Sequence, residues 1–362
     1  MKYLLGFLVV CLGTCLCGCV QTMQSVIDKK ETPGERIKAF CIDFNWGSKG
    51  FAPPGMYAHA SPKEHFEWYK DLGANTIQTF CVSCCGYAWF QSSVAPVQPG
   101  MKGDFLGELT KLGHGEGMKV MGYFCVGANT YWGQTHPDQS YGAPSAIHIP
   151  FTLDYLEYLS ATIEDVLIKT GIDGFMIDWV FHPEQAQSVD TIAWMDCEKQ
   201  MYRELLGKPF PGKEKISQEE LDTFNRLATE RCWRWIHDTA KRVKSDCIIW
   251  LTSHNLTRTE SSGSAMLKEV DWVMNEHPDP TFLASIREGI GPHQQLIQCI
   301  CGWGPQHDAA ELLADPAMQN VGLYGFARPD PITTLPPSES KDPSLSGNAH
   351  NIFIIREAYR SE

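Results

Sequence analysis

Eight short apolar runs alternate with amphipathic stretches along the chain, and this alternation constrains the fold more than any other feature. The runs span residues 38–46, 75–81, 118–126, 175–178, 247–252, 270–274, 295–301 and 321–326. Short apolar runs of this kind are typical of parallel strands that are buried on both faces. Eight strands, mostly separated by helices, predict a single catalytic domain of the α/β class with a (β/α)8 TIM barrel fold, rather than an open sheet.

Several stretches between the runs carry helix signals. Ser61 and Pro62 are suited to begin a helix that Gly73 would end. Further helices are expected at residues 104–116, 153–170, 218–244 and 348–360. A longer insertion, residues 183–217, follows the fourth apolar run.

Charge and motifs exclude several classes of partner. The formal net charge is −13, and no basic patch offsets it, so nucleic acid is not expected as a partner. No glycine-rich dinucleotide fingerprint or phosphate loop follows any of the apolar runs. The sequence therefore predicts neither a nucleotide nor any other cofactor.

Polar and aromatic side chains follow the apolar runs, at the strand ends where a barrel carries its catalytic groups. Aromatic rings stack on sugar faces, and acids and amides bind hydroxyl groups, so this combination favours a carbohydrate pocket. The residues predicted to bind substrate are Asp43, Asn45, Trp46, Tyr87, Trp89, Tyr123, Trp132, Trp179, His182, His254 and Trp303.

Asp178 and Glu276 are the predicted catalytic pair, because each directly ends an apolar run and glycoside cleavage needs two carboxyl groups. In a retaining mechanism Asp178 attacks the anomeric carbon and Glu276 acts as acid and then base, with the carboxyls about 5 Å apart. The apolar strand end and the Asp178 charge are expected to raise the pKa of Glu276. The structural alternatives are a capping role for Asp178 and an ion pair of Glu276 with His277 or Arg328.

Short motifs in the N-terminal half resemble the α-L-fucosidase-like group of barrel glycosidases and the related hypothetical glycosyl hydrolase barrels. They are residues 73–80, 86–90, 121–124 with Trp132, and 173–178. The resemblance implies that the nucleophile is the Asp ending the fourth strand, which is Asp178. Fucosidases usually carry Trp shortly before this Asp and Gly after it, whereas Met176 and Trp179 stand here. Carboxylates on strands four and six also fit barrels of the α-galactosidase type, so the sugar is left open.

The N-terminal residues are typical of an export signal. A Lys is followed by an apolar run too short to span a bilayer comfortably, and residues 16–19 resemble the lipobox of bacterial lipoproteins. We expect residues 1–19 to be a lipoprotein-type signal with Cys19 as the lipidated residue, residues 20–35 to be a tether, and residues 36–362 to be the barrel. The protein would then be an exported, bacterial cell-envelope lipoprotein, anchored in the outer membrane and either periplasmic or surface-exposed. An ordinary cleaved signal and an uncleaved anchor are the alternatives.

Ten of the fourteen cysteines lie beyond the signal segment. Those within or at the ends of apolar runs are expected to be small buried hydrophobes: Cys41, Cys81, Cys125, Cys247, Cys299 and Cys301. Residues 81–85 hold three cysteines but lack the second paired motif that is typical of zinc sites, so no metal is predicted.

Two other functions remain open at the level of sequence. One is a glycan-binding surface lipoprotein that retains the barrel without its chemistry. The other is a metal-dependent hydrolase of the amidohydrolase type using His182, His254 and acids, although residues 43–45 lack the His-x-His pair that such enzymes carry after their first strand.

Overall fold

The structure is a computed structural model, in which Ile37–Glu362 is the unit that contains the barrel strands. The residues that it describes are 35–47, 50–141, 148–181, 194–253, 256–301, 308–341 and 348–361. The predicted signal and tether, including Cys19, therefore lie outside the described residues. So do His182, His254 and Trp303.

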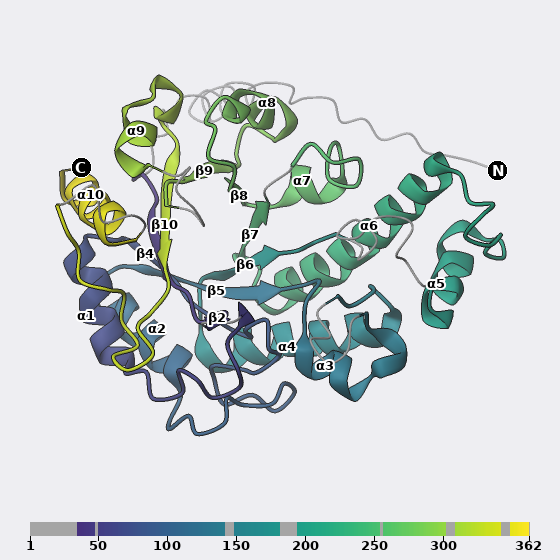
Figure 1. The fold of residues 1–362 in the computed structure, drawn as a ribbon, viewed down its shortest axis with the longest axis horizontal. Helices are drawn as coiled ribbons and strands as arrows, with labels where there is room; N and C mark the ends of the chain where they lie inside the picture. The colour runs from purple at the N-terminus through teal and green to yellow at the C-terminus, as the bar shows by residue number, and fades with distance from the viewer. Residues whose placement is uncertain are drawn as a thin grey trace, which may run out of the picture. The chain divides into compact units, whose positions relative to one another are not determined.

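Eight parallel strands close into a barrel at the centre of this unit (Figure 1), which confirms the predicted (β/α)8 fold. The strands follow one another around the barrel in the order β1-β10-β9-β8-β7-β6-β5-β4. Their bounds are β1 Lys38–Ile42, β4 Thr76–Gln78, β5 Lys119–Cys125, β6 Gly174–Asp178, β7 Ile248–Ser253, β8 Trp272–Asn275, β9 Gln295–Cys299 and β10 Gly322–Ala327. Each lies within or next to one of the eight predicted runs. A small antiparallel pair, β2 (Trp46–Gly47) and β3 (Gly50–Phe51), follows β1.

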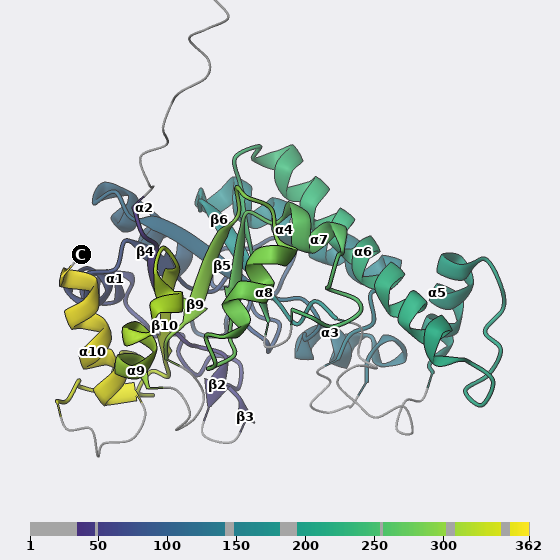
Figure 2. The ribbon, with the colours of Figure 1, turned by 90° about the horizontal axis from the view of Figure 1, so that it is seen from above.

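Helices surround the barrel strands (Figures 1 and 2). Their bounds are α1 Pro62–Leu72, α2 Phe105–Gly115, α3 Thr130–Thr135, α4 Leu153–Thr170, α5 Asp196–Leu206, α6 Gln218–Val243, α7 Ala265–Glu269, α8 Phe282–Gly289, α9 Ala309–Ala314 and α10 Asn348–Ser361, with short 3-10 turns at Pro137–Gln139 and Pro316–Met318. Within the described ranges, no helix combines the length and the apolar content needed to cross a membrane.

The predicted helix signals act as expected. The Ser61 hydroxyl accepts a hydrogen bond from the Glu64 N–H at 3.3 Å, and Gly73 ends α1 with a left-handed φ of 86°. Glycine takes this conformation without the steric cost that a β-carbon brings. The helices expected at 104–116, 153–170, 218–244 and 348–360 are present as α2, α4, α6 and α10.

Two local features differ from the sequence expectation. The insertion after β6 contains helix α5, which packs beside the N-terminal part of α6 (Figure 2) and buries Met201 and Tyr202. The first apolar run spans residues 38–46, and β1 covers only its first part, ending at Ile42 just before Asp43. The Asn45 N–H donates to the Asp43 carboxylate at 2.8 Å, and this local turn competes with further strand pairing.

The cysteines in the barrel behave as small apolar residues. The six that were predicted to be buried are buried, and they are thiols rather than members of disulfides. Cys84, Cys85 and Cys232 are also buried, and Cys197 is partly exposed.

Gly174 allows strands β6 and β7 to approach closely. A β-carbon at this position would lie 1.9 Å from the Ile248 carbonyl oxygen, which belongs to the backbone of β7. A shift of a flexible side chain cannot relieve this clash, so the register that leads to Asp178 depends on glycine here.

We expect Gly174→Ala to lower the free energy of unfolding by more than about 4 kcal/mol, or to prevent folding. Gly171→Ala is the matched control. Gly171 ends α4 with φ 71° and has nothing within 4 Å of its added β-carbon, so its substitution should cost only about 1–2 kcal/mol. Urea unfolding followed by tryptophan fluorescence measures both. Equal losses in the two variants would contradict the role assigned to Gly174.

Candidate active site

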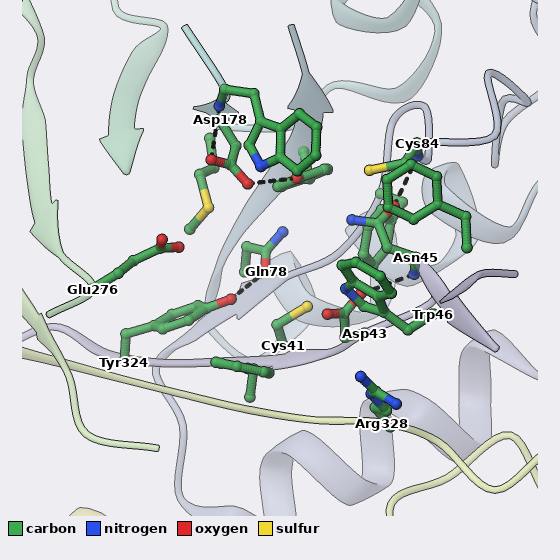
Figure 3. Close-up of a pocket in the computed structure, with 16 residues that line it drawn as sticks. Cys41, Asp43, Asn45, Trp46, Gln78, Cys84, Asp178, Glu276, Tyr324 and Arg328 are labelled. Atoms are coloured by element: carbon green, nitrogen blue, oxygen red, sulfur yellow. Dashed lines mark hydrogen bonds between the residues drawn. The ribbon is translucent and has the colours of Figure 1, made fainter. Parts of the chain in front are cut away.

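A cavity of about 330 Å³ opens at the C-terminal ends of the barrel strands (Figure 3). We call it the central cavity. Its lining residues come from β1, β4, β5, β6, β10 and the segments that follow β1, β4, β6, β8 and β10: Cys41, Asp43, Asn45, Trp46, Phe51, Gln78, Phe80, Cys84, Tyr123, Met176, Asp178, Trp179, Glu276, Tyr324, Phe326 and Arg328. Three carboxyl groups, those of Asp43, Asp178 and Glu276, therefore share this space.

Asp178 is the last residue of β6, and two donors hold its carboxylate. The Tyr123 hydroxyl donates to Oδ2 at 2.7 Å, and the Trp179 N–H donates to Oδ1 at 2.7 Å. Burial raises the pKa of Tyr123 well above its usual value, so its hydroxyl stays protonated and remains a donor. Hydrogen bonds of this type stabilise the ionised form of a carboxyl group. The arrangement suits an anionic nucleophile.

Asp43 lies in the turn after β1 and is almost fully buried. Burial raises the pKa of Asp43 to about 7, and the charge of Asp178 adds to the increase. The hydrogen bond from the Asn45 N–H and the charge of Arg328 lower the pKa but do not cancel the effect of burial. The Asn45 side chain in turn accepts a hydrogen bond from the Cys84 N–H at 2.8 Å. This bond joins the turn after β1 to the segment after β4.

Glu276 directly follows β8, and its N–H donates to the Ser253 carbonyl oxygen at 3.2 Å. Its side chain points into the same space as Asp43 and Asp178 (Figure 3). Burial raises the pKa of Glu276 to about 7; a hydrogen bond from Thr252 lowers it, and the charge of Asp43 raises it. The shift has the direction expected from the sequence. A carboxyl group with such a pKa can hold a proton near neutrality and release it.

The structure brings together some of the predicted site residues and separates others. Asp43, Asn45, Trp46, Tyr123, Asp178, Trp179 and Glu276 all line the central cavity. Three of the other aromatics contact different neighbours. Trp89 stacks on Phe44 at 4.2 Å, Trp132 stacks on His136 at 3.7 Å, and Tyr87 packs edge-on against Tyr131.

Several lining residues were not among the sequence candidates. Gln78 ends β4, and its side chain accepts a hydrogen bond at 3.0 Å from the hydroxyl of Tyr324 on β10, so this bond links the two strands that flank β1. Cys41 also lines the floor, and Arg328 lies at the rim, 5.6 Å above the Trp46 ring. Arg328 is a polar residue that follows an apolar run, which is a signal available from the sequence, whereas Gln78 lies inside the run at residues 75–81. Tyr324 lies inside an apolar run, so only the barrel register shows that it faces the cavity.

A second cavity adjoins the first, with a volume of about 410 Å³. We call it the lateral cavity. Asp178, Trp179 and Glu276 line both cavities, and the remaining lining residues of the lateral cavity are His148, Val180, Phe181, Leu251, Thr252, Ser253, Arg258, Glu260, Ser261 and Met266. The two predicted catalytic carboxyls thus stand at the junction of two spaces.

Across the described part of the chain, no group of three or more His, Cys, Asp or Glu side chains is arranged to hold a metal ion. The same is true of the cysteines within residues 81–85. No metal site is therefore assigned to these residues.

Comparison with known proteins gives a family for one segment. Residues 61–179, which run from α1 to the end of β6 and include Asp178, match the family described as "Hypothetical glycosyl hydrolase 6". This chain resembles the barrel glycoside hydrolases. The resemblance that the N-terminal motifs indicated is thereby confirmed. No curated protein matches the chain.

Solved structures of glycoside hydrolases share the fold. Alpha-L-fucosidase isoenzyme 2 from Paenibacillus thiaminolyticus superposes with a TM-score of 0.63 at 16% identity, over 90% of this chain and 49% of that one. The chain therefore spans about half the length of that fucosidase. The PgaB (BpsB) glycoside hydrolase domain from Bordetella bronchiseptica superposes with a TM-score of 0.56 at 12% identity, over 90% of this chain and 98% of that one. At these identities the likeness establishes a common barrel.

We expect Tyr123→Phe to weaken the function of Asp178 without disturbing the barrel. The change removes the donor at Oδ2 and leaves the ring, which packs 5.1 Å from Phe80. A hydrogen bond to a charged group is worth about 1.5–3 kcal/mol, so kcat/KM for a hydrolysed glycoside should fall about 10- to 100-fold. The acid limb of its pH profile should move to higher pH, because the carboxylate is then harder to ionise. Tyr87→Phe, outside the central cavity, is the control. An unchanged acid limb in Tyr123→Phe would contradict this role.

Proposed function

We propose that this protein is a glycoside hydrolase that releases a terminal sugar from a glycan with retention of configuration. One observation carries the proposal. Asp178, held by two hydrogen-bond donors, shares a cavity with Glu276, whose pKa burial raises to about 7. One carboxyl group that stays ionised and one that stays protonated are the pair that glycoside cleavage requires.

Each group has a defined part in the proposed reaction. Asp178 attacks the anomeric carbon as the bond from that carbon to the leaving oxygen breaks. The leaving oxygen takes the proton of Glu276, and a covalent bond joins the sugar to Asp178. Water then attacks the anomeric carbon, Glu276 removes a proton from the water, and the Asp178 carboxylate is released. The net change is addition of one water across the glycosidic bond.

Asp43 is less suited than Glu276 to protonate the leaving group, although the pKa values of both are raised to about 7. Of these two cavities Asp43 lines the central one, whereas Glu276 lines both and so reaches the boundary between two parts of a substrate. We assign Asp43 a hydrogen bond to a hydroxyl of the sugar in the central cavity.

The central cavity is near the lower end of the volume range of small-molecule sites, and this supports recognition of one sugar at a chain end. Trp46, Phe51 and Trp179 supply aromatic faces, and Asn45, Gln78 and Arg328 supply polar groups for hydroxyls. α-L-Fucosides are the first substrates to test because of the resemblance stated above, followed by α-galactosides.

We also propose that the protein is exported and anchored to the cell envelope by lipid on Cys19. The lipobox-like residues 16–19 and the polar tether after them support this location. An envelope enzyme would meet glycans outside the cytoplasm.

We expect Asp178→Asn to lower kcat on aryl glycosides by about a thousandfold or more, because the nucleophile is lost. Glu276→Gln should lower kcat about 100-fold or more on substrates with poor leaving groups. It should lower kcat much less on substrates with activated leaving groups, because these depart without a proton. Steady-state kinetics measures both losses, and NMR of the first-formed anomer tests retention. Turnover that survives both substitutions would rule out this assignment. Sugar binding by a wild-type protein without turnover would instead indicate a glycan-binding lipoprotein.

We expect kcat/KM to fall as the pH rises through about 7. A carboxyl group with its pKa near 7 is protonated below that pH, so the acid form of Glu276 is lost above it. The pH profile of Glu276→Gln on an activated substrate should lack this basic limb. Asp43→Asn should keep it, which distinguishes the two buried acids. Loss of the limb in Asp43→Asn alone would assign the acid to Asp43.

A further inference from the structure

We infer that the lateral cavity binds a neutral sugar on the leaving-group side of the scissile bond. This inference rests on the proposed hydrolase function and adds to it a second sugar, so the preferred substrate is an oligosaccharide rather than a glycoside with a small leaving group. The position of the cavity, the conformation of Trp179 and the polar groups in the wall support this second sugar.

The cavity has the position that a leaving group needs. Asp178 ends β6 and Glu276 follows β8, so the two carboxyls flank β7 in the barrel. The central cavity extends from them toward β1, which is on the opposite side of the barrel. The lateral cavity extends from them over residues 251–253 at the end of β7 and over lining residues between 258 and 266. A glycosidic bond held between the two carboxyls would direct one sugar into each cavity.

Trp179 forms the wall that the two cavities share. Its backbone is in the left-handed region with φ 54°, which costs a residue other than glycine about 1–2 kcal/mol. Its ring lies 6.2 Å from Phe51, which lines the central cavity. It also stacks against His148 at 5.4 Å and Phe181 at 5.9 Å, which both line the lateral cavity. The resemblance to fucosidases would place glycine here, so this chain gains an aromatic face at a position that favours glycine.

Arg258 and Glu260 supply the polar chemistry of the lateral cavity. The Arg258 guanidinium lies over the Phe181 ring at 5.3 Å from its centre, with about a third of the side chain exposed. Glu260 is 1% exposed. Among the described residues its Oε1 has no hydrogen-bond partner, although Arg258 Nη1 is 3.9 Å away. A buried carboxylate oxygen without a partner needs a hydrogen-bond donor. A hydroxyl group of the sugar can donate to it, while Arg258 donates to the neighbouring oxygen of the same sugar.

The charges favour a neutral sugar. Among the described residues that line the lateral cavity, Arg258 is the one Lys or Arg, and it shares the cavity with three carboxyl groups, those of Glu260, Asp178 and Glu276. An acidic sugar would add a fourth carboxylate to this wall and be repelled. Hydroxyl groups, which both donate and accept, suit a mixed pair of guanidinium and carboxylate.

The test compares two substrates with the same terminal sugar, that of an aryl glycoside which the wild type hydrolyses. One is a disaccharide with a neutral sugar as leaving group, and the other is the glycosyl fluoride, whose leaving group is too small to fill the lateral cavity. We expect Glu260→Gln and Arg258→Met each to lower the ratio of kcat/KM for the disaccharide to kcat/KM for the fluoride about 10- to 100-fold. Glu288→Gln, an exposed residue of α8 outside both cavities, should leave the ratio unchanged.

The outcomes separate this inference from the proposed function. If the wild type turns over both substrates and neither variant changes the ratio, the lateral cavity is not the leaving-group site. The same conclusion follows if both variants lower the two rates equally. If the wild-type ratio of kcat/KM for the disaccharide to kcat/KM for the fluoride is higher when the leaving sugar is a uronic acid, the choice of a neutral sugar is overturned. If the wild type hydrolyses no aryl glycoside, the proposed hydrolase function fails, and the inference fails with it.

Discussion

Strand β1 pairs in parallel with β10 on one side and with β4 on the other, and this closure is the constraint on which the site depends. A closed parallel sheet has no free edge, and the C-terminal ends of all its strands meet at one rim. The closure brings Asp43, from the start of the domain, into the same cavity as Asp178 and Glu276. An open sheet made from the same strands would leave Asp43 at one edge, far from Glu276.

Placing three carboxyl groups in one cavity makes their ionisation less favourable, and this raised proton affinity serves the proposed function. Burial raises the pKa of Asp43 and of Glu276 to about 7 from ordinary values of 3.8 and 4.5. Between the ordinary and the raised pKa values, the folded chain binds more protons than the unfolded chain, so stability decreases as the pH rises through that window. The same proton affinity makes a carboxyl group useful as a general acid. Asp178 is stabilised differently, by donors from Tyr123 and its own chain neighbour.

The fold was largely predictable because its signals are local. Apolar runs of strand length predicted all eight barrel strands, and Ser61 and Gly73 predicted both ends of α1. Features in which one set of hydrogen bonds or contacts competes with another were not predictable. The turn at Asp43 ends β1 earlier than its apolar run suggests, and α5 becomes stable by burying Met201 and Tyr202 beside α6. Neither interaction has a periodic pattern that a reader of the sequence could recognise.

The sequence by itself determined that eight strands would present polar and aromatic residues at one rim, and it singled out Asp178 and Glu276 among them. The tertiary structure decided which of those residues share a cavity. Trp46 and Tyr123 face the carboxyls, whereas Trp89 and Trp132 stack on Phe44 and His136. It also decided that Gln78 and Tyr324, on the two strands that flank β1, share a hydrogen bond and that a second cavity adjoins the first. The physical reason is that strand ends are encoded locally, while the direction of each side chain depends on the register and packing of strands far apart in sequence.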